Sequence, residues 1–221
     1  MLTIAVDGYA SSGKGAVCSK LAKKLGVIHF ETGAIYRVIG YNVIKNNIDP
    51  YNIDDVYESL NTLEIKLDHN DGEQITYLNG EDVSSKIHSA QVSDVCSITS
   101  AYPKCREFVL NIQRESAKKY SMIMEGRDIT SHVLPDAQFK FMLNADIKVR
   151  SERRYKDLIN KGENVTLESV EADLIERDKR DTQRELSPLI LTEGTLYIDN
   201  SNMTIDEEVN LMYNIIMSGD K

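Results

Sequence analysis

The sequence predicts an α/β fold with a parallel sheet of five strands flanked by helices. Short apolar runs rich in β-branched residues alternate with segments of helical periodicity, beginning with residues 2–6 and 14–25. Hydrophobic residues make up 41% and charged residues 28% of the 221 residues, which excludes a disordered or fibrous chain. Because ligands of such sheets bind at the carboxyl ends of the strands, the loops after the strands are the candidate site.

The first half of the chain combines two strand–helix units with a segment of a different kind. A second strand is expected at residues 27–30 and a second helix at 34–45. Residues 63–67 and 74–78 then alternate apolar and polar side chains around an Asn-Asp-Gly turn, which is typical of an antiparallel hairpin with one solvated face. We therefore expect residues 47–100 to form a lobe inserted between the second and third strands of the sheet.

The second half returns to the alternation of strands and helices. The remaining strands and the closing amphipathic helix are expected at residues 121–124, 139–143, 196–198 and 205–217. Two polar helices, at about 148–160 and from Thr166 onward, precede the last strand, and Thr166 with Ser169 offers the second helix only an imperfect N-cap. The segments thus divide into a helical unit at 148–184 and a core of residues 1–46, 101–147 and 185–221.

Charge and cysteine content narrow the range of partners. The formal net charge is −9, from 35 acidic and 26 basic residues, which argues against a polynucleotide partner because such binding neutralises many phosphates at once. No segment has the pattern of a signal peptide or the roughly 18 apolar residues of a membrane span, so we expect a cytoplasmic protein with no membrane attachment. Cys18, Cys96 and Cys105 lack metal-ligand spacing and are expected to be reduced, buried thiols.

Arginines are concentrated in the second half of the chain. Of the ten arginines, Arg37 alone lies in the first hundred residues, and the other nine fall between Arg106 and Arg184. The planar guanidinium group suits phosphate, so this concentration in an acidic chain suggests one site for a polyanion, with surface ion pairs as the alternative.

A phosphate-binding loop follows the first predicted strand. Gly8, four further residues, Gly13 and Lys14 join this strand to a predicted helix, which is the structural context of the P-loop. Glycines let backbone N–H groups converge on phosphates, the helix N-terminus adds partial positive charge, and Lys14 reaches the terminal phosphates. Gly15 and Ala16 offer no hydroxyl for Mg²⁺.

The loop by itself fits a kinase, a GTPase, a motor ATPase or a sulfotransferase-like protein. Residues 160–163 read Asn-Lys-Gly-Glu and end in the wrong residue for guanine recognition, which disfavours a GTPase. A motor would bring a longer chain and an acid placed to activate water. Without a hydroxyl directly after Lys14, Mg²⁺ is expected to be held by nucleotide phosphates and waters, with Glu125 or Asp128 as acceptors for those waters.

Seven motifs, in order and at compatible spacing, make the chain resemble the bacterial cytidylate kinases. They are GYASSGKG (8–15), TGAIYR (32–37), GEDVS (80–84), EGRDI (125–129), LPDA (134–137), RDKRD (177–181) and SPL (187–189). The resemblance implies a P-loop NTPase-like core, an NMP-binding lobe enlarged by an antiparallel insert, and a mobile helical lid. It implies transfer of a phosphoryl group from ATP, with Mg²⁺, to CMP or dCMP. We expect a monomer whose partners are these small molecules.

The resemblance also assigns residues to each substrate. ATP is expected at the loop residues Gly8, Tyr9, Ala10, Ser11, Ser12, Gly13, Lys14, Gly15 and Ala16. CMP is expected at Arg37, Arg127 and Arg184 through its phosphate, at Thr32, Ser97, Arg106 and Asp128 through its base, and at Arg177 and Asp181 through its pentose. The residues expected to act in catalysis are Lys14, Arg127, Arg184 and the lid arginines Arg153 and Arg154.

These assignments also make chemical sense from the residues. Cytosine presents an exocyclic amine and two acceptors, which suits the carboxylate of Asp128 with the donors Arg106 and Ser97. The alternatives are an ion pair of Asp128 with Arg127 or another neighbour, and a surface hydroxyl at Ser97. Arg177, Asp181 and Arg184 are spaced by four and three residues and share a helix face, unless that helix is merely covered by solvated ion pairs.

Three departures from the family pattern leave other functions open. Thr130-Ser131-His132 replaces Gly-Thr-Val, Glu31 replaces an aspartate, and Ala16 replaces a threonine, which should weaken nucleotide binding by about 0.5–1.5 kcal/mol. The alternatives are a small-metabolite or UMP/CMP kinase, and a nucleotide-binding regulatory protein with weakened catalysis. A small-metabolite kinase would need a carboxylate base, whereas the phosphate of CMP is already ionised and the four histidines have no catalytic spacing.

Overall fold

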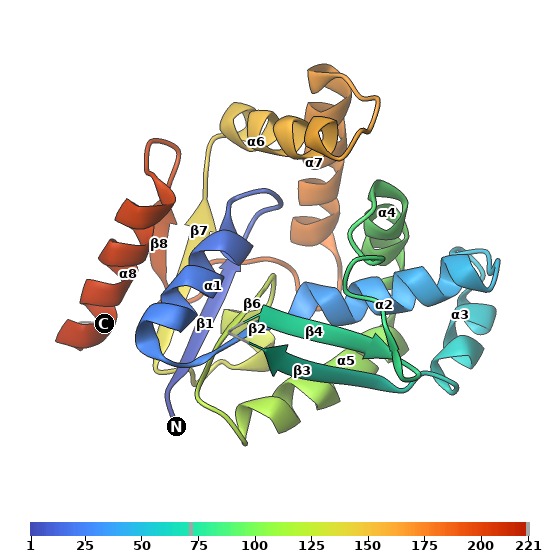
Figure 1. Ribbon diagram of the computed structural model, residues 1–221, viewed down its shortest axis with the longest axis horizontal. Helices are drawn as coiled ribbons and strands as arrows, with labels where there is room; N and C mark the ends of the chain where they lie inside the picture. Colours follow the sequence, from blue (N-terminus) through green and yellow to red (C-terminus); the bar gives the residue numbers. More distant parts are fainter. Residues whose placement is uncertain (71–72, 220–221) are drawn as a thin grey trace.

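A five-stranded parallel sheet lies at the centre of the computed structural model, which describes residues 1–70 and 73–219 (Figure 1). Its strands are β1 (Thr3–Gly8), β2 (Ile28–Glu31), β6 (Met122–Gly126), β7 (Phe139–Asn144) and β8 (Leu196–Asp199). Their order across the sheet is β2-β6-β1-β7-β8, and all neighbouring pairs are parallel. The predicted fold class and the five predicted strands are confirmed, with ends shifted by one or two residues.

Helices cover both faces of this sheet. The helices α1 (Lys14–Leu25) and α8 (Ile205–Ser218) lie on one face, and α2 (Thr32–Lys45) and α5 (Pro103–Ala117) lie on the other. Successive residues of β1 divide between the two layers, because Ile4 and Val6 join the cluster of α1 and α8 whereas Ala5 joins that of α2 and α5. Strand β1 is therefore buried on both faces, and the loop that follows it begins from a rigid position.

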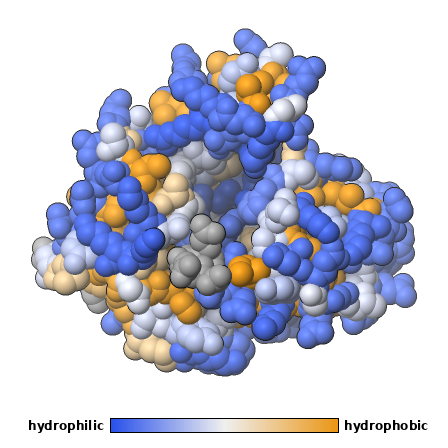
Figure 2. Space-filling view, in the orientation of Figure 1, coloured by the Kyte–Doolittle hydropathy of each residue, from blue (hydrophilic) through white to orange (hydrophobic). Residues whose placement is uncertain are grey.

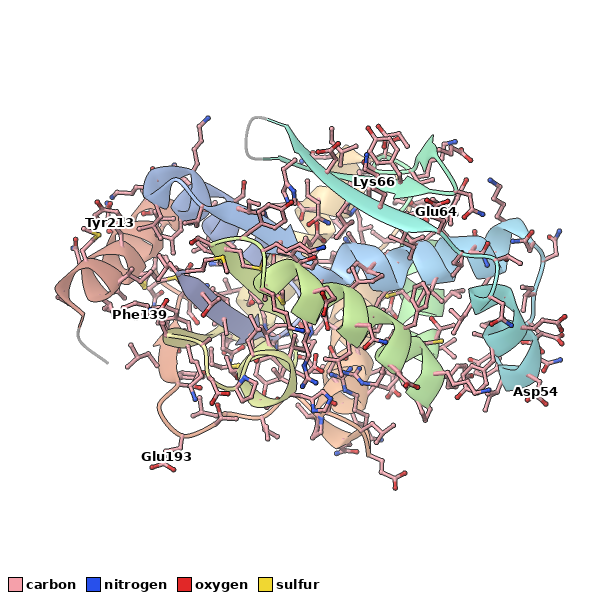
Figure 3. All side chains as sticks on the ribbon, turned by 90° about the horizontal axis from the view of Figure 1, so that it is seen from below. Asp54, Glu64, Lys66, Phe139, Glu193 and Tyr213 are labelled. Atoms are coloured by element: carbon pink, nitrogen blue, oxygen red, sulfur yellow. The ribbon has the colours of Figure 1, made fainter. Side chains whose placement is uncertain are left out.

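The segment between β2 and β6 contains a second, antiparallel sheet. Its strands are β3 (Ile65–Asn70), β4 (Glu73–Leu78) and β5 (Glu81–Asp82), accompanied by the helices α3 (Ile53–Leu60) and α4 (Ala90–Thr99). Glu64 and Lys66 lie on the outer side of the hairpin, away from α2 (Figure 3). The predicted hairpin is confirmed, although residues 71–72 of its turn lie outside the described residues.

Two helices, α6 (Ile147–Asn160) and α7 (Leu167–Gln183), stand above the carboxyl ends of the strands (Figure 1). Thr166 caps α7 more completely than predicted: its Oγ accepts from the N–H of Ser169 at 3.2 Å, and the Ser169 hydroxyl accepts from the N–H of Thr166 at 3.2 Å. The prediction of an imperfect cap was wrong because serine reaches back as a glutamate would. In the described part of the chain, no helix has the length and apolar character needed to cross a membrane.

Candidate active site

The loop from Gly8 to Lys14 joins β1 to α1, as the sequence predicts. A Cβ at Gly8 would collide with the carbonyl oxygen of Leu143 on the neighbouring strand β7, so only glycine allows the strands to approach this closely. Gly13 has a φ of 90°, and Ser11 adopts a φ of 58°, an uncommon conformation for a residue with a side chain. The loop therefore keeps a specific shape that its surroundings must hold.

Lys14 is buried at the centre of this loop. Its Nζ donates to the carbonyl oxygens of Gly8 at 2.9 Å and Tyr9 at 2.8 Å, and to the hydroxyl of Ser12 at 3.4 Å. Burial, together with the nearby charge of Arg127, lowers the pKa of Lys14 from 10.5 to about 7. An anion bound at the loop would stabilise the charged form of this side chain.

A cavity of about 530 Å³ opens beside the loop, under α6 and α7. Figure 2 shows it as a hollow with hydrophilic residues in its depth. Residues 10–16 line it, and so does every residue expected to contact CMP or to act in catalysis. Gly8 and Tyr9 do not line it, and their carbonyl oxygens accept hydrogen bonds from Lys14. The remaining candidates come together from segments far apart in the sequence.

Two pairs of charged side chains form the wall opposite the loop. Asp128 pairs with Arg106, and both side chains are buried. Arg127 donates its Nε–H to Asp181 at 2.8 Å, so the ion pair considered for Asp128 is formed with Arg106 and not with Arg127. Arg184 lies between the two carboxylates: its Nη2 is 3.8 Å from Oδ1 of Asp128, and its Nη1 is 3.9 Å from Oδ1 of Asp181. Each guanidinium group is therefore held in place by a carboxylate.

Several donors in the cavity keep unused hydrogen-bonding capacity. Within residues 1–70 and 73–219, the buried atoms Ser97 Oγ, Arg177 Nε and Arg184 Nη2 have no hydrogen-bond partner. A buried polar group without a partner is costly, and the three residues that carry these atoms line the same cavity. A small rotation of each side chain would let it hydrogen-bond to a polar ligand bound there.

Glu31, one of the departures from the family pattern, has a clear role in this structure. Its carboxylate, at the N-cap of α2, pairs with Arg37 in the second turn of that helix. Burial opposes the ionisation of Glu31, but the charge of Arg37 outweighs it, and the pKa of Glu31 lies below its ordinary value. Gln74 on β4 holds the backbone of the same residue, accepting from its N–H at 2.9 Å and donating to its carbonyl at 3.3 Å. The hairpin thus supports the segment that carries Arg37.

Glu125 lies beside the start of α1. A Cβ placed on Gly15 would be 3.4 Å from Glu125 Oε1, so this carboxylate occupies the side of the loop where a serine or threonine would project. The same oxygen lies 2.8 Å from Nε2 of the buried His29. Among the described residues, no group of three or more His, Cys, Asp or Glu side chains is arranged to hold a metal ion.

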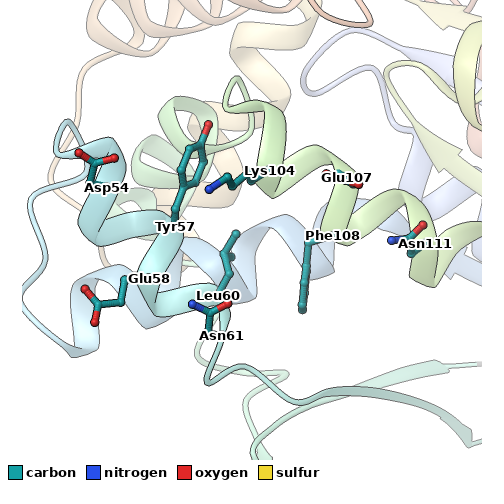
Figure 4. A pocket seen from close by; sticks show the side chains of 9 residues that line it. All are labelled: Asp54, Tyr57, Glu58, Leu60, Asn61, Lys104, Glu107, Phe108 and Asn111. Carbon is teal, nitrogen blue, oxygen red and sulfur yellow. The ribbon is translucent and has the colours of Figure 1, made fainter.

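A second cavity, of about 540 Å³, lies between α3 and α5, and carboxylates predominate among its charged lining residues (Figure 4). Asp54, Glu58 and Glu107 line it, and the ammonium group of Lys104 lies 4.7 Å from the ring centroid of Tyr57. Three carboxylates do not favour a phosphate ester. The cavity beside the loop is therefore the candidate active site.

Comparison with known proteins shows the family to which this chain belongs. The cytidylate kinase family model matches residues 4–218. A cytidylate kinase of Caldanaerobacter subterraneus subsp. tengcongensis is 41% identical over 218 residues, covering 99% of this chain and 96% of that protein. The chain belongs to the cytidylate kinase family. A cytidylate kinase of Caldicellulosiruptor bescii is 40% identical over 206 residues, covering 93% of this chain and 91% of that protein.

The comparisons confirm the resemblance to bacterial cytidylate kinases that the seven motifs indicated. Among solved structures, an uncharacterized protein from Eubacterium ventriosum matches with a TM-score of 0.54 and 14% identity over 99% of each chain. At that identity the match supports the fold alone. The matched residues 4–218 include the antiparallel sheet and the helices α6 and α7.

The structure adds to this cytidylate kinase site buried residues that sequence reasoning missed. Asp7, at the end of β1, accepts hydrogen bonds from the N–H groups of Ile129 and Thr130 at 2.8 and 2.7 Å and from the Thr130 hydroxyl at 2.7 Å. These three hydrogen bonds fix the π-helical turn η1 (Ile129–Val133) that follows Asp128, and the one from its hydroxyl gives Thr130 a structural role. Burial raises the pKa of Asp7 to about 6. Its place at the carboxyl end of the central strand was the available signal.

Arg150 and Asn200 were also missed, and both touch the phosphate loop. Arg150 donates from Nη1 to the carbonyl of Ala10 at 3.1 Å and to Asp178 on α7 at 2.7 Å. Asn200 donates from Nδ2 to the carbonyl of Ser12 at 2.7 Å. Arg150 was counted among the clustered arginines without a role, and Asn200 directly follows the last strand of the sheet.

Proposed function

We propose that this member of the cytidylate kinase family transfers the γ-phosphoryl group of ATP to CMP or dCMP, giving ADP and CDP or dCDP. The observation that carries the proposal is the meeting of Asp128, Arg106 and Ser97 in the cavity that the phosphate loop also lines. One carboxylate and two donors are the set that the edge of cytosine requires. The family match supports the same substrate.

Recognition of the base rests on Asp128. Its carboxylate accepts from the exocyclic amine of cytosine, while Arg106 and the unpartnered Ser97 hydroxyl donate to the ring nitrogen and carbonyl. The ion pair with Arg106 orients the carboxylate of Asp128 before the base arrives. Uracil places a carbonyl oxygen against this carboxylate, which costs about 1–3 kcal/mol and gives tens to hundreds of fold in discrimination.

Arg37, Arg127 and Arg184 bind the phosphate of the acceptor, and Arg177 and Asp181 contact its pentose. Two observations support this assignment: all five line one cavity, and Arg177 Nε and Arg184 Nη2 have no partner among the described residues. Carboxylates already hold three of these arginines, so little side-chain entropy is lost on binding. The group is suited to a phosphate monoester carried on a nucleoside.

Phosphoryl transfer here requires positioning and charge neutralisation and no general base, because the attacking oxygen of CMP is already ionised. Lys14 neutralises charge on the transferring group from the loop side. Arg153 and Arg154 on α6 neutralise it from above, and Arg127 and Arg184 hold the attacking phosphate in line. Closure of the helices over both nucleotides excludes water and so prevents hydrolysis of ATP.

Mg²⁺ accompanies ATP in this proposal and supplies positive charge between its phosphates. The residues fit a hydrated ion. Glu125 lies beside Gly15, on the side of the loop where a hydroxyl residue would project, and it offers carboxylate oxygen as an acceptor for metal-bound water. Its hydrogen bond with His29 fixes the orientation of that carboxylate.

The same proposal assigns the larger segments. Residues 47–100 form the acceptor-binding lobe, residues 148–184 form the lid and its flanking helices, and the remainder forms the core. The docking of Gln74 on Glu31 supports a lobe that acts directly on the acceptor site. We further propose that the protein works as a cytoplasmic monomer on these small-molecule substrates.

A coupled assay of ADP release tests the function. With ATP and Mg²⁺, we expect rapid turnover of CMP and dCMP and turnover of UMP and AMP slower by tens to hundreds of fold. Equal rates with all four acceptors would remove base recognition from the proposal. ATP binding without any formation of CDP would instead identify a nucleotide-binding protein that does not catalyse transfer.

A further inference from the structure

We infer that Asn200 is a positioning residue of the donor site, which holds the phosphate loop and Arg153 in one fixed relation. This inference rests on the proposed function in that it takes the loop as the site of the donor phosphates. Asn200 directly follows β8, at the carboxyl end of the sheet, and its side chain is 1% exposed. No motif of the sequence includes it.

Every polar group of Asn200 is used. Its Nδ2 donates to the carbonyl of Ser12 at 2.7 Å and to the two carboxylate oxygens of Glu208 at 3.0 and 2.9 Å. Its Oδ1 accepts from Nη1 of Arg153 at 3.1 Å, and its backbone carbonyl accepts from Nη2 of the same arginine at 3.1 Å. Its own N–H donates to the carbonyl of Asn144 at the end of β7, at 2.8 Å. One buried residue thus joins the loop, α6, α8 and the sheet.

Glu208 on α8 determines which end of the amide faces the loop. A carboxylate only accepts hydrogen bonds, so the NH₂ group of Asn200 must point toward Glu208 and Ser12, and its oxygen must point toward Arg153. Glu208 is 3% exposed; burial raises its pKa, and the hydrogen bond from Asn200 and the positive charges of Arg153 and Lys14 oppose that rise. The Ser12 carbonyl, which only accepts, and the Arg153 guanidinium, which only donates, require the same orientation of the Asn200 amide.

The hydrogen bond from Asn200 to the Ser12 carbonyl also orients N–H groups of the loop. In a trans peptide the carbonyl of one residue and the N–H of the next point in opposite directions. Fixing the Ser12 carbonyl toward Asn200 therefore turns the N–H of Gly13 the other way, and Gly13 lines the cavity. Arg150 acts similarly on the preceding side, where it binds the carbonyl of Ala10 and so orients the N–H of Ser11. The uncommon conformation at Ser11 lies between these two contacts.

Replacement of Asn200 by alanine tests the inference. We expect Asn200→Ala to raise the KM for ATP, and the Kd for a non-hydrolysable ATP analogue measured by calorimetry, by about tenfold, because the loop loses a buried partner. The KM for CMP should stay within about twofold, because the side-chain hydrogen bonds of Asn200 in the described structure go to Ser12, Glu208 and Arg153 and not to the proposed CMP residues. The matched control is Asn202→Ala, the same substitution at an exposed position of the same turn, which should leave both values unchanged.

Glu208→Gln keeps the test decisive if Asn200→Ala folds poorly, and a double variant tests whether Asn200 acts through Arg153. Glu208→Gln keeps the shape of the site but lets the amide of Asn200 turn around, so it should reproduce the rise in the KM for ATP. Arg153→Ala combined with Asn200→Ala should lower kcat little further than Arg153→Ala alone, because Asn200 acts on transfer through Arg153.

Equal rises in the KM for ATP and for CMP, or an unchanged KM for ATP in both Asn200→Ala and Glu208→Gln, would overturn the inference. The binding measurement with the ATP analogue needs no phosphoryl transfer. A wild-type protein that forms no CDP would therefore contradict the proposed function and still leave the role of Asn200 testable.

Discussion

The donor and acceptor halves of the cavity are built in different ways. On the donor side, hydrogen bonds from Asn200 and Arg150 hold backbone carbonyls, and the loop presents peptide N–H groups from residues adjacent in sequence. On the acceptor side, charged side chains from separate elements hold one another, as in the pairs of Asp128 with Arg106 and of Asp181 with Arg127. In the proposed reaction, the backbone groups bind phosphate alone, whereas the side-chain pairs also bind the base.

Removal of Lys14 has the largest expected effect, because it takes the only ammonium group from the centre of the donor loop as described. We expect Lys14→Ala to lower kcat/KM for CMP phosphorylation by about 10²–10³-fold or more, with the fold retained in a circular dichroism spectrum. Lys23→Ala, at an exposed position of the same helix, is the matched control and should behave as wild type. A loss in kcat/KM below tenfold would show that the donor half does not depend on this charge.

Asp128→Asn tests the acceptor half with less change of shape. An amide can present its oxygen to cytosine or its NH₂ group to uracil, so we expect the ratio of kcat/KM for CMP over UMP to fall by about 10–100-fold. Asp136→Asn, an exposed aspartate beyond η1, supplies the control. If the CMP/UMP ratio of Asp128→Asn matches that of the wild type, base recognition lies elsewhere.

The charge of Lys14 makes ATP binding depend on pH. Because burial lowers the pKa of Lys14 to about 7, the free protein carries this side chain mostly neutral at higher pH, and bound phosphates restore the charge by raising its pKa. ATP binding at pH 8.5 should therefore take up ~1 proton, and affinity should fall up to about tenfold between pH 7.5 and 8.5. Calorimetry in buffers of different ionisation enthalpy measures the uptake, and Lys14→Arg should abolish it. If the wild type takes up no proton on binding ATP at pH 8.5, Lys14 is already charged in the free protein at that pH.

Ala16→Thr has the smallest expected effect. The added hydroxyl gives the loop a donor for a phosphate oxygen, so the KM for ATP should fall by about twofold to tenfold, equivalent to 0.5–1.5 kcal/mol. The KM for CMP should not change, which would show again that the two halves are separable. A rise in the KM for ATP would mean that Ala16 is required for packing at the start of α1.

The sequence predicts the local parts of this molecule well. The five strands, the hairpin and the strand–loop–helix unit at Gly8 and Lys14 each depend on residues close in the chain, and the structure confirms them. The cap at Thr166 was misjudged only because Ser169 can substitute for the expected glutamate. These local elements can be predicted because the periodicity and residue spacing that determine each of them lie within one short segment.

Contacts between distant segments could not be predicted in the same way. Asn200 and Ser12 are separated by 188 positions, and Thr130 and Asp7 by 123, so neither hydrogen bond leaves a pattern in the sequence. Likewise, the pairing of Asp128 with Arg106 depends on how α5 packs against η1, which directly follows Asp128. The family resemblance assigned Asp128 and Arg106 to the same base before the structure showed them as a pair. It assigned no role to Asn200 or Glu208.

Ala10 belongs to two structures at once. It is a residue of the phosphate loop, and it is also part of the hydrophobic cluster that joins α6 and α7 through Leu158, Val170 and Leu174. A swing of these helices that left the loop behind would open this cluster to water at a cost. Movement of α6 and α7 is therefore coupled to the conformation of the phosphate loop through the methyl group of Ala10.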